Sequence, residues 1–202
     1  MAERARLVIG ISGASGVIYG VRLLELLQGL SVETHLVISK AAEVTLAHET
    51  ERKVAEVQGL AHRAYAATDI AAPIASGSFR ARGMIVAPCS IRSMSEIACG
   101  TTSSLLTRAA DVTLKERRPL VLMVRETPLH LGHLRTMTAL AEMGAVIAPP
   151  VPAFYAEPTT LAEMIDHTLG RVLDLFGIEL PGLKRWGEGA GENETLQPLR
   201  RR

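Results

Sequence analysis

Short apolar runs alternate with longer amphipathic stretches along this chain, and that alternation is the feature that most restricts its fold. The runs are residues 7–11, 34–38, 83–87, 120–124 and 145–148. Runs that are apolar throughout, rather than at every second position, are typical of strands covered on both faces in a parallel sheet. The pattern therefore predicts a three-layer doubly wound α/β fold of the Rossmann or flavodoxin-like type, with right-handed crossovers.

Helical spacing predicts where the covering helices lie. We expect one helix from Val17 onward and others near 41–60, 91–99, 104–117, 130–143 and 159–176. The last is the clearest, because Thr159 or Thr160 can cap its start and Gly177 follows its end. Segment 59–82 fits no element apart from a weak strand near 62–65. We expect one flavoprotein-like domain over 1–180 and a tail over 181–202 that contacts an oligomer partner or is partly disordered.

The amino-acid composition argues against some classes of binding partner and some cellular locations. The chain has 22 Lys and Arg against 21 Asp and Glu, and only 3% aromatic residues, which argues against nucleic acid as a partner. It has no apolar stretch of about 18 residues, so we expect no membrane span. Cys89 and Cys99 form no C-x-x-C pair, and the start of the chain lacks a signal-peptide pattern. These features predict a cytoplasmic location.

In such a sheet, ligands bind beyond the carboxyl ends of the strands, where the strand order reverses. The first run leads into Gly13-Ala14-Ser15-Gly16 and then a helix, which suits an anionic ligand, although a tight turn without a ligand would look the same. The second run ends at Ser39-Lys40, where an NAD site would need an acidic residue. This favours a phosphate or a flavin over NAD.

Two further strand ends carry polar residues. Pro88-Cys89-Ser90-Ile91-Arg92-Ser93 could cradle a phosphate, or Ser90 could simply cap a helix. Arg125-Glu126 place a cation and a carboxylate after the fourth run, as a functional pair or as a surface ion pair. Glu126, His130 and His133 could suggest a metal site, but no further ligand has a suitable spacing, so we expect no metal. Four other candidate residues could have purely structural roles, as far as their spacing shows. They are Lys115, Tyr155, Arg171 and Trp186.

Taken in order, several segments resemble the flavin prenyltransferases of the UbiX type, which are related to the phenylacrylic-acid decarboxylase accessory proteins. These segments are 13–16, 38–40, 75–78, 88–90, 109–120, 125–130, 144–147, 152–155 with Pro158, and 185–187. The resemblance extends from about residue 6 to 188. It departs from the family at Ile70, where relatives often have an aromatic residue, and at Ile91-Arg92, where other pairs are common.

The resemblance implies a metal-independent transfer of a dimethylallyl group from dimethylallyl phosphate to N5 and C6 of reduced FMN. The product, prenylated FMN, would serve a UbiD-type decarboxylase. Family members commonly assemble as homododecamers that share sites between subunits. By the same resemblance, FMN is held by Gly13, Ala14, Ser15, Ser39, Ser90, Ile91, Arg92, Ser93 and Arg125. The prenyl phosphate is bound by Lys115, Tyr155 and Arg171.

The resemblance also suggests roles for five catalytic residues, which are Ser15, Glu49, Lys115, Glu126 and Trp186. Lys115 would stabilise the departing phosphate together with Arg171, and Glu126 would handle the phosphate proton. Glu49 would assist proton removal at C6, and Ser15 would hydrogen-bond near flavin N5. Trp186 would help to keep water away from the prenyl group.

Two other functions remain open at this point. One is an FMN-dependent flavoprotein of the cysteine-decarboxylase type, but the Asn-bearing Pro-x-Met segment and the substrate clamp of those enzymes are not found. The other is a flavin carrier without catalytic activity, which would not need Glu49, Glu126 or Lys115.

Overall fold

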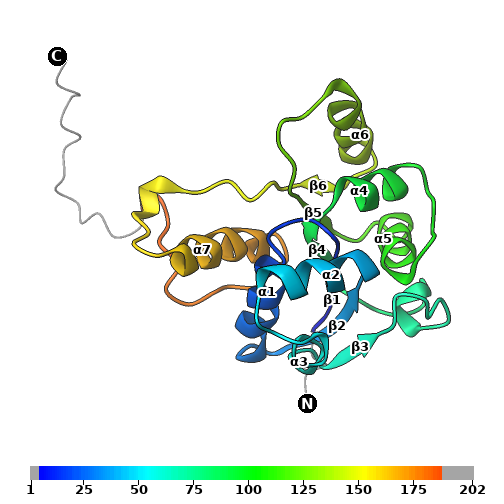
Figure 1. The fold of residues 1–202 in the computed structure, drawn as a ribbon, viewed down its shortest axis with the longest axis horizontal. Helices are drawn as coiled ribbons and strands as arrows, with labels where there is room; N and C mark the ends of the chain where they lie inside the picture. Colours follow the sequence, from blue (N-terminus) through cyan, green and yellow to red (C-terminus); the bar gives the residue numbers. More distant parts are fainter. Residues whose placement is uncertain (1–4, 188–202) are drawn as a thin grey trace.

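A parallel sheet of six strands forms the middle of the computed structural model, which describes residues 5–187 (Figure 1). The strands are β1 (Ala5–Ile11), β2 (Val32–Ile38), β3 (Arg63–Tyr65), β4 (Gly83–Cys89), β5 (Leu120–Val124) and β6 (Val146–Ile147). Their order is β3-β2-β1-β4-β5-β6, so the strand order reverses between β1 and β4. The predicted doubly wound α/β fold is confirmed.

Helices cover both faces of the sheet, and each face has its own apolar core. One layer contains α1 (Ile18–Gln28), α2 (Lys40–Glu49), α3 (Val54–Gly59) and α7 (Leu161–Asp174). The other contains α4 (Ile91–Ala98), α5 (Leu105–Lys115) and α6 (Leu131–Glu142). Because side chains alternate along a strand, Leu7 and Ile9 of β1 enter the first core and Val8 enters the second. Short 3₁₀ helices lie at η1 (Pro73–Ala75) and η2 (Phe154–Ala156).

The structure confirms the predicted strands and all but one of the predicted helices. The continuous helix expected over 41–60 is wrong, because the chain forms α2 and α3 with a break between them. Thr50 adopts an extended backbone conformation, and its hydroxyl donates to the carbonyl of Leu46, which ends α2. The side chain of Glu56 then accepts from the N–H of Lys53 and starts α3 as a capping residue.

The last described residues, up to 187, pack beside α7. Thr160 caps α7 by accepting from the N–H of Glu163 (3.1 Å), and Gly177 follows with a φ of +60°. Residues 181–187 return along this helix, whereas the rest of the predicted tail, 188–202, lies outside the described residues. A long connection leads from β6 across the molecule to α7 (Figure 1).

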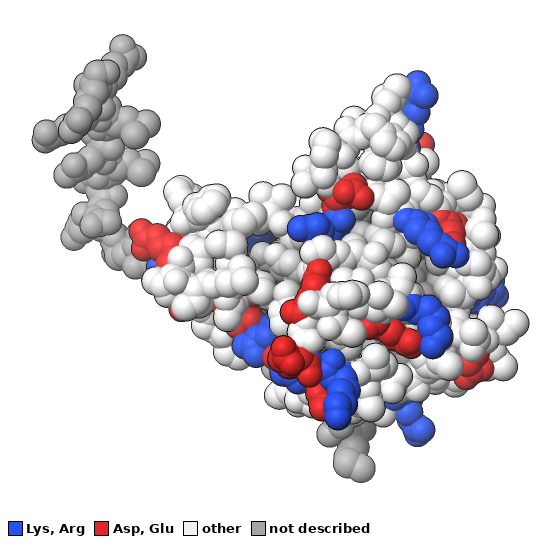
Figure 2. Space-filling model, viewed as in Figure 1, with Lys and Arg blue, Asp and Glu red and all other residues white. Residues whose placement is uncertain are grey.

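The surface carries charges of both signs. Figure 2 shows acidic and basic side chains interspersed over the face that is drawn. Within residues 5–187, no helix is both long and apolar enough to cross a membrane.

Candidate active site

A buried serine joins the ends of β1 and β4 at the point where the strand order reverses. The Ser12 hydroxyl donates to the carbonyl of Pro88 (2.9 Å) and accepts from the N–H of Ser90 (2.7 Å). Proline has no N–H to give to a sheet, and the pairing of β4 with β5 shifts register near Pro88. The loops after β1 and β4 are therefore fixed beside each other. Sequence reasoning missed Ser12, although its place directly after the first apolar run was a usable signal.

The glycine-rich loop after β1 packs closely against the start of α2. A Cβ atom at Gly13 would lie 2.3 Å from the Cβ of Ala41 and 2.9 Å from its carbonyl carbon, so the loop has no room for a side chain there. Ala14 and Ser15 continue this loop toward α1, and Ser15 is exposed. The close approach explains why glycine stands at the first position of the motif.

Glu49, at the end of α2, caps the start of α1. Its carboxylate accepts from the N–H groups of Gly16 (2.8 Å) and Val17 (3.2 Å) and from the hydroxyl of Ser15. α1 has no side-chain cap from its own first residue, so this carboxylate satisfies N–H groups that would otherwise lack an acceptor in the protein. The structure thus brings into contact Ser15 and Glu49, two residues to which the family resemblance assigns catalytic roles.

The same contacts keep Glu49 ionised. Partial burial by itself would raise the pKa of Glu49, but the hydrogen bonds from Ser15, Gly16 and Val17 outweigh it. The positive charge of Arg125 adds to their effect, and the pKa of Glu49 lies below its ordinary value. At neutral pH this side chain is a carboxylate that accepts hydrogen bonds.

Two serines that were predicted to bind FMN cap helices in this chain. The Ser39 hydroxyl accepts from the N–H of Ala42 (3.2 Å) at the start of α2, and Ser90 accepts from the N–H of Ser93 (3.2 Å) at the start of α4. Both helix starts lie at the carboxyl edge of the sheet. A helix start of this kind presents N–H groups to an anion, so capping and ligand binding are compatible at these positions.

Arg125 and Glu126 follow β5 at the same edge. The backbone N–H of Arg125 donates to the carbonyl of Cys89 (3.1 Å), which holds the loop after β5 beside the loop after β4. Both side chains are exposed, and the Glu126 carboxylate accepts from the N–H of Thr127 (3.0 Å). The predicted FMN-binding residues and Glu126 thus lie on the loops and helix starts that follow four adjacent strands, β2, β1, β4 and β5, and Glu49 reaches the loop after β1 from the end of α2. We call this set the carboxyl-edge cluster: Gly13, Ala14, Ser15, Ser39, Glu49, Ser90, Ile91, Arg92, Ser93, Arg125 and Glu126.

The carboxyl-edge cluster has the chemistry that a flavin mononucleotide requires. Backbone N–H groups at two helix starts and serine hydroxyls can bind a phosphate, and the guanidinium of Arg125 can add a charge-assisted hydrogen bond. The close-packed glycine loop lets the backbone approach a flat ring system. The side chain of Arg92 pairs instead with Glu96 (2.9 Å) on an exposed face of α4.

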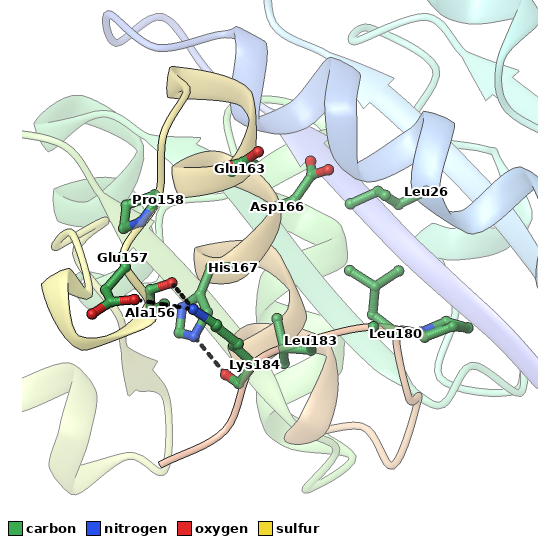
Figure 3. Close-up of a pocket in the computed structure, with 12 residues that line it drawn as sticks. Leu26, Ala156, Glu157, Pro158, Glu163, Asp166, His167, Leu180, Leu183 and Lys184 are labelled. Atoms are coloured by element: carbon green, nitrogen blue, oxygen red, sulfur yellow. Dashed lines mark hydrogen bonds and ion pairs between the residues drawn. The ribbon is translucent and has the colours of Figure 1, made fainter. Parts of the chain in front are cut away.

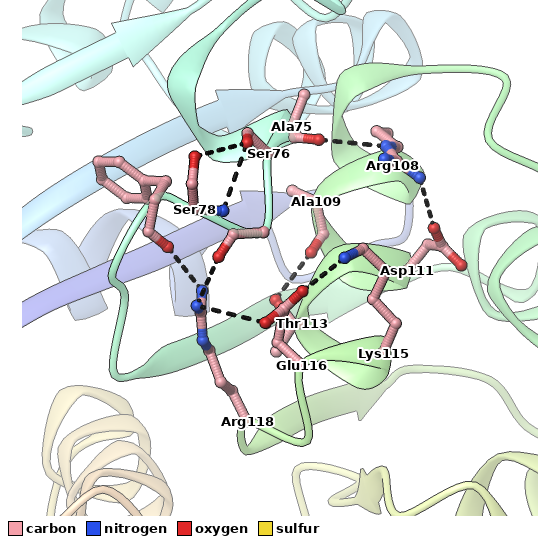
Figure 4. A network of polar contacts seen from close by, with 12 residues as sticks. Ala75, Ser76, Ser78, Arg108, Ala109, Asp111, Thr113, Lys115, Glu116 and Arg118 are labelled. Carbon is pink, nitrogen blue, oxygen red and sulfur yellow. Dashed lines mark hydrogen bonds and ion pairs between the residues drawn. The ribbon is translucent and has the colours of Figure 1, made fainter.

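Lys115 lies away from this cluster within one chain. It ends α5, and β5 begins only five residues later, which places Lys115 near the amino edge of the parallel sheet. Its ammonium group pairs with Glu116, as Figure 4 shows, and lies 2.7 Å from the position that a Cβ atom at Gly77 would take. In the same network, Arg118 donates to the carbonyls of Gly77 (2.8 Å) and Phe79 (2.6 Å).

Tyr155, Arg171 and Trp186 form a third group on α7 and the segments beside it. Together with Arg185 they line an open cavity of about 260 Å³. The rings of Tyr155 and Trp186 meet edge to face, with centroids 5.5 Å apart. α7 and α5 lie on opposite faces of the sheet (Figure 1), so a single chain does not bring Lys115 to this cavity.

The histidine that precedes α6 has a structural role, whereas the buried Nδ1 atom of His133 has no hydrogen-bond partner among the described residues. The Nδ1 atom of His130 accepts from the N–H groups of Gly132 (3.0 Å) and His133 (3.4 Å), which makes His130 the cap of α6. In the described part of the chain, no group of three or more His, Cys, Asp or Glu side chains is placed to hold a metal ion.

Comparison with known proteins adds to this geometry. A family model described as Flavoprotein matches residues 1–174. The flavin prenyltransferase UbiX of Escherichia coli strain K12 is 62% identical over 177 residues, which cover 87% of this chain and 94% of the relative.

Solved structures agree with the sequence match. AnUbiX (PadA1), solved in complex with FMN and dimethylallyl pyrophosphate, superimposes with a TM-score of 0.90 at 48% identity over 91% of this chain and 98% of its own. A dodecameric FMN-dependent UbiX-like decarboxylase from Escherichia coli O157:H7 gives a TM-score of 0.87 at 47% identity, covering 90% of this chain and 98% of its own.

Proposed function

The chain belongs to the flavoprotein family and, within it, to the UbiX-type flavin prenyltransferases, and we propose that it joins a dimethylallyl group from dimethylallyl phosphate to reduced FMN. The observation that carries this proposal is the 62% identity to a flavin prenyltransferase over 94% of that enzyme's length. The carboxyl-edge cluster supports it, because the residues that the family resemblance assigns to FMN gather there in this chain.

In the proposed reaction, the bond between the prenyl carbon and the phosphate oxygen breaks, and that carbon bonds to N5 of the reduced flavin, which loses its proton. The prenyl double bond takes up a proton while its tertiary carbon bonds to C6, and C6 loses a proton. Inorganic phosphate leaves with one of the two released protons, and the other replaces the proton that the double bond takes up. The protein must therefore hold two ligands face to face, stabilise a departing phosphate and accept a proton. These tasks need cations and carboxylates rather than a metal ion.

We assign the acid–base tasks to the two carboxylates of the carboxyl-edge cluster. Glu49 is ionised and hydrogen-bonded to Ser15, so it can accept a proton while Ser15 orients the ring near N5. Glu126 is exposed beside Arg125 and can exchange a proton with the phosphate.

The donor site requires a second copy of the chain. Tyr155, Arg171 and Trp186 lie together on α7 and beside it, whereas Lys115 lies across the sheet on α5. We propose that a neighbouring copy supplies Lys115 to the phosphate in a homododecamer. The dodecameric relative of the same fold, at 47% identity, supports this arrangement. We also propose that the enzyme is cytoplasmic and that a UbiD-type decarboxylase uses its prenylated FMN.

Mass spectrometry of the flavin tests the proposed function. The purified protein is incubated with FMN, dithionite as the reductant and dimethylallyl phosphate, without any partner protein, and the released flavin is analysed. We expect a product heavier than FMN by one five-carbon prenyl unit, and a Lys115→Ala variant should form it much more slowly. Unchanged FMN in the wild-type reaction would contradict the proposal and favour the flavin-carrier function.

A further inference from the structure

The C-terminal segment 183–186 is attached to one face of α7, and we call this segment the strap. Its carbonyl at Lys184 accepts from Nε2 of His167 (3.0 Å), a contact that Figure 3 shows. Leu183 packs over Gly170, where a Cβ atom would lie 2.7 Å from the Leu183 side chain. His167, Gly170 and Asp174 are spaced three and four residues apart, so they share one face of the helix.

Asp174 provides the polar anchor of the strap. Its two carboxylate oxygens accept from Arg185 at 2.8 and 2.7 Å, and one of them also accepts from Arg171 at 3.1 Å. A bidentate pair of this kind fixes the orientation of the guanidinium as well as its distance. The hydrogen bonds from Arg185 and the charge of both arginines hold the pKa of Asp174 below its ordinary value despite partial burial.

The contacts of Asp174 also fix two walls of the cavity of about 260 Å³ beside α7, which we call the donor cavity because we assign it to the prenyl phosphate. Trp186 directly follows Arg185 and meets Tyr155 edge to face, and Tyr155 in turn meets the ring of His167 at 5.4 Å. The cavity of about 260 Å³ is therefore cationic on the side of Arg171 and Arg185 and aromatic on the side of Tyr155 and Trp186. The carboxylate of Asp174 pairs with the guanidinium groups of both Arg171 and Arg185, and its negative charge offsets the repulsion between them.

We propose that Asp174 is a positioning residue of the donor site, which docks the strap on α7 so that Arg185 and Trp186 face Arg171 and Tyr155 across one cavity. Asp174 does not touch the substrate; it acts through Arg171 and Arg185. Arg185 thereby becomes a second phosphate-facing guanidinium, while Trp186 covers the prenyl group. This inference rests on the proposed function for the identity of the ligand, but the docking of the strap does not depend on it.

The test uses Asp174→Asn, with Asp166→Asn as a matched control. Asp166 also lies on α7 and forms a bidentate pair of the same kind with Arg22 (2.7 and 2.8 Å), but that pair faces α1. Trp186 is the only tryptophan in the chain, so its fluorescence anisotropy reports whether the strap is docked. Asp174→Asn should lower the anisotropy and raise KM for dimethylallyl phosphate by about tenfold or more, with a smaller change in kcat and no change in FMN affinity.

A second variant separates docking from stability. Gly170→Ala should raise the helix propensity of α7 but crowd Leu183, so we expect a stable protein with lower Trp186 anisotropy and a higher KM. Unchanged anisotropy and KM in Asp174→Asn would overturn the inference, as would equal effects in Asp166→Asn. Lower anisotropy with an unchanged KM in an active enzyme would also overturn it. Absence of prenyl transfer in the wild-type protein would instead refute the proposed function, and the anisotropy would still report on docking.

Discussion

The Glu49→Gln variant tests the hydrogen bonds of Glu49 with the start of α1, which we expect to contribute to both stability and catalysis. The carboxylate accepts from the N–H groups of Gly16 and Val17 and from Ser15, at the positive end of the α1 dipole. Hydrogen bonds to a charged group contribute about 1.5–3 kcal/mol and neutral ones about 0.5–1.5 kcal/mol, so Gln retains part of the contact. Because Glu49 is exposed, solvent screening reduces the difference, and we expect Glu49→Gln to lose about 1 kcal/mol of unfolding free energy at neutral pH.

The pH dependence of this loss follows from the direction of the pKa shift. The folded-state pKa of Glu49 is depressed, so its contribution is present above the unfolded pKa and is lost as the pH falls through the folded pKa. Urea denaturation should therefore show a gap between wild type and Glu49→Gln at pH 7 that closes below about pH 4. The variant should still bind FMN, but it should form prenylated FMN about 10²–10⁴-fold more slowly.

The control for this prediction lies on the same helix. Glu43 lies half-buried in the first turn of α2 and pairs with the exposed Lys40 (3.0 Å), so Glu43→Gln should cost no more than about 0.5 kcal/mol at neutral pH and should leave the reaction rate unchanged. The reasoning is refuted if Glu49→Gln is as stable as Glu43→Gln at pH 7, or if it forms the ring-closed product at the wild-type rate.

Three further predictions concern the loops after β1 and β4 and the two cysteines. Ser12→Ala leaves the N–H of Ser90 without its acceptor, so it should cost about 1–3 kcal/mol in urea denaturation and weaken FMN binding in a fluorescence titration; wild-type values for both would contradict the proposed link between the two loops. Gly13→Ala should abolish FMN binding in the same titration, because its Cβ would overlap the start of α2, and retained affinity would show that the loop can move. In the native protein a thiol reagent should modify exposed Cys99 but not Cys89, whose pKa burial raises to about 12; peptide mapping that finds both modified before unfolding would be inconsistent with that burial.

The sheet was predictable from the sequence because its central strands are buried on both faces. Runs such as 120–124 admit no exposed polar residue, so β5 was predicted with its observed bounds. The break between α2 and α3 was not predicted, because it depends on where the side chains of Thr50 and Glu56 form hydrogen bonds rather than on apolar spacing. The residues on both sides of such a break have the composition of a helix, so composition does not reveal it.

The candidate site was predictable to the extent that strand topology determines it. Residues that directly follow parallel strands must meet at one edge, which is why Ser15, Ser90 and Arg125 lie on neighbouring loops. Contacts between distant segments were not predictable in this way. The capping of α1 by Glu49 and the pairing of Asp174 with Arg185 join residues whose approach is known only after the chain has folded.

Lys115 lies on α5, remote from the cavity beside α7, so the proposed reaction depends on sites that are shared between copies of the chain. A complementation assay tests this sharing most directly: Lys115→Ala and Glu126→Gln are produced separately and coexpressed, and prenylated FMN is quantified for each preparation. If one copy supplies Lys115 to the Glu126 of another, mixed assemblies contain some sites with both wild-type residues, and activity should exceed that of either variant alone. Activity no higher than that of the separate variants, in assemblies shown to contain both chains, would contradict the claim.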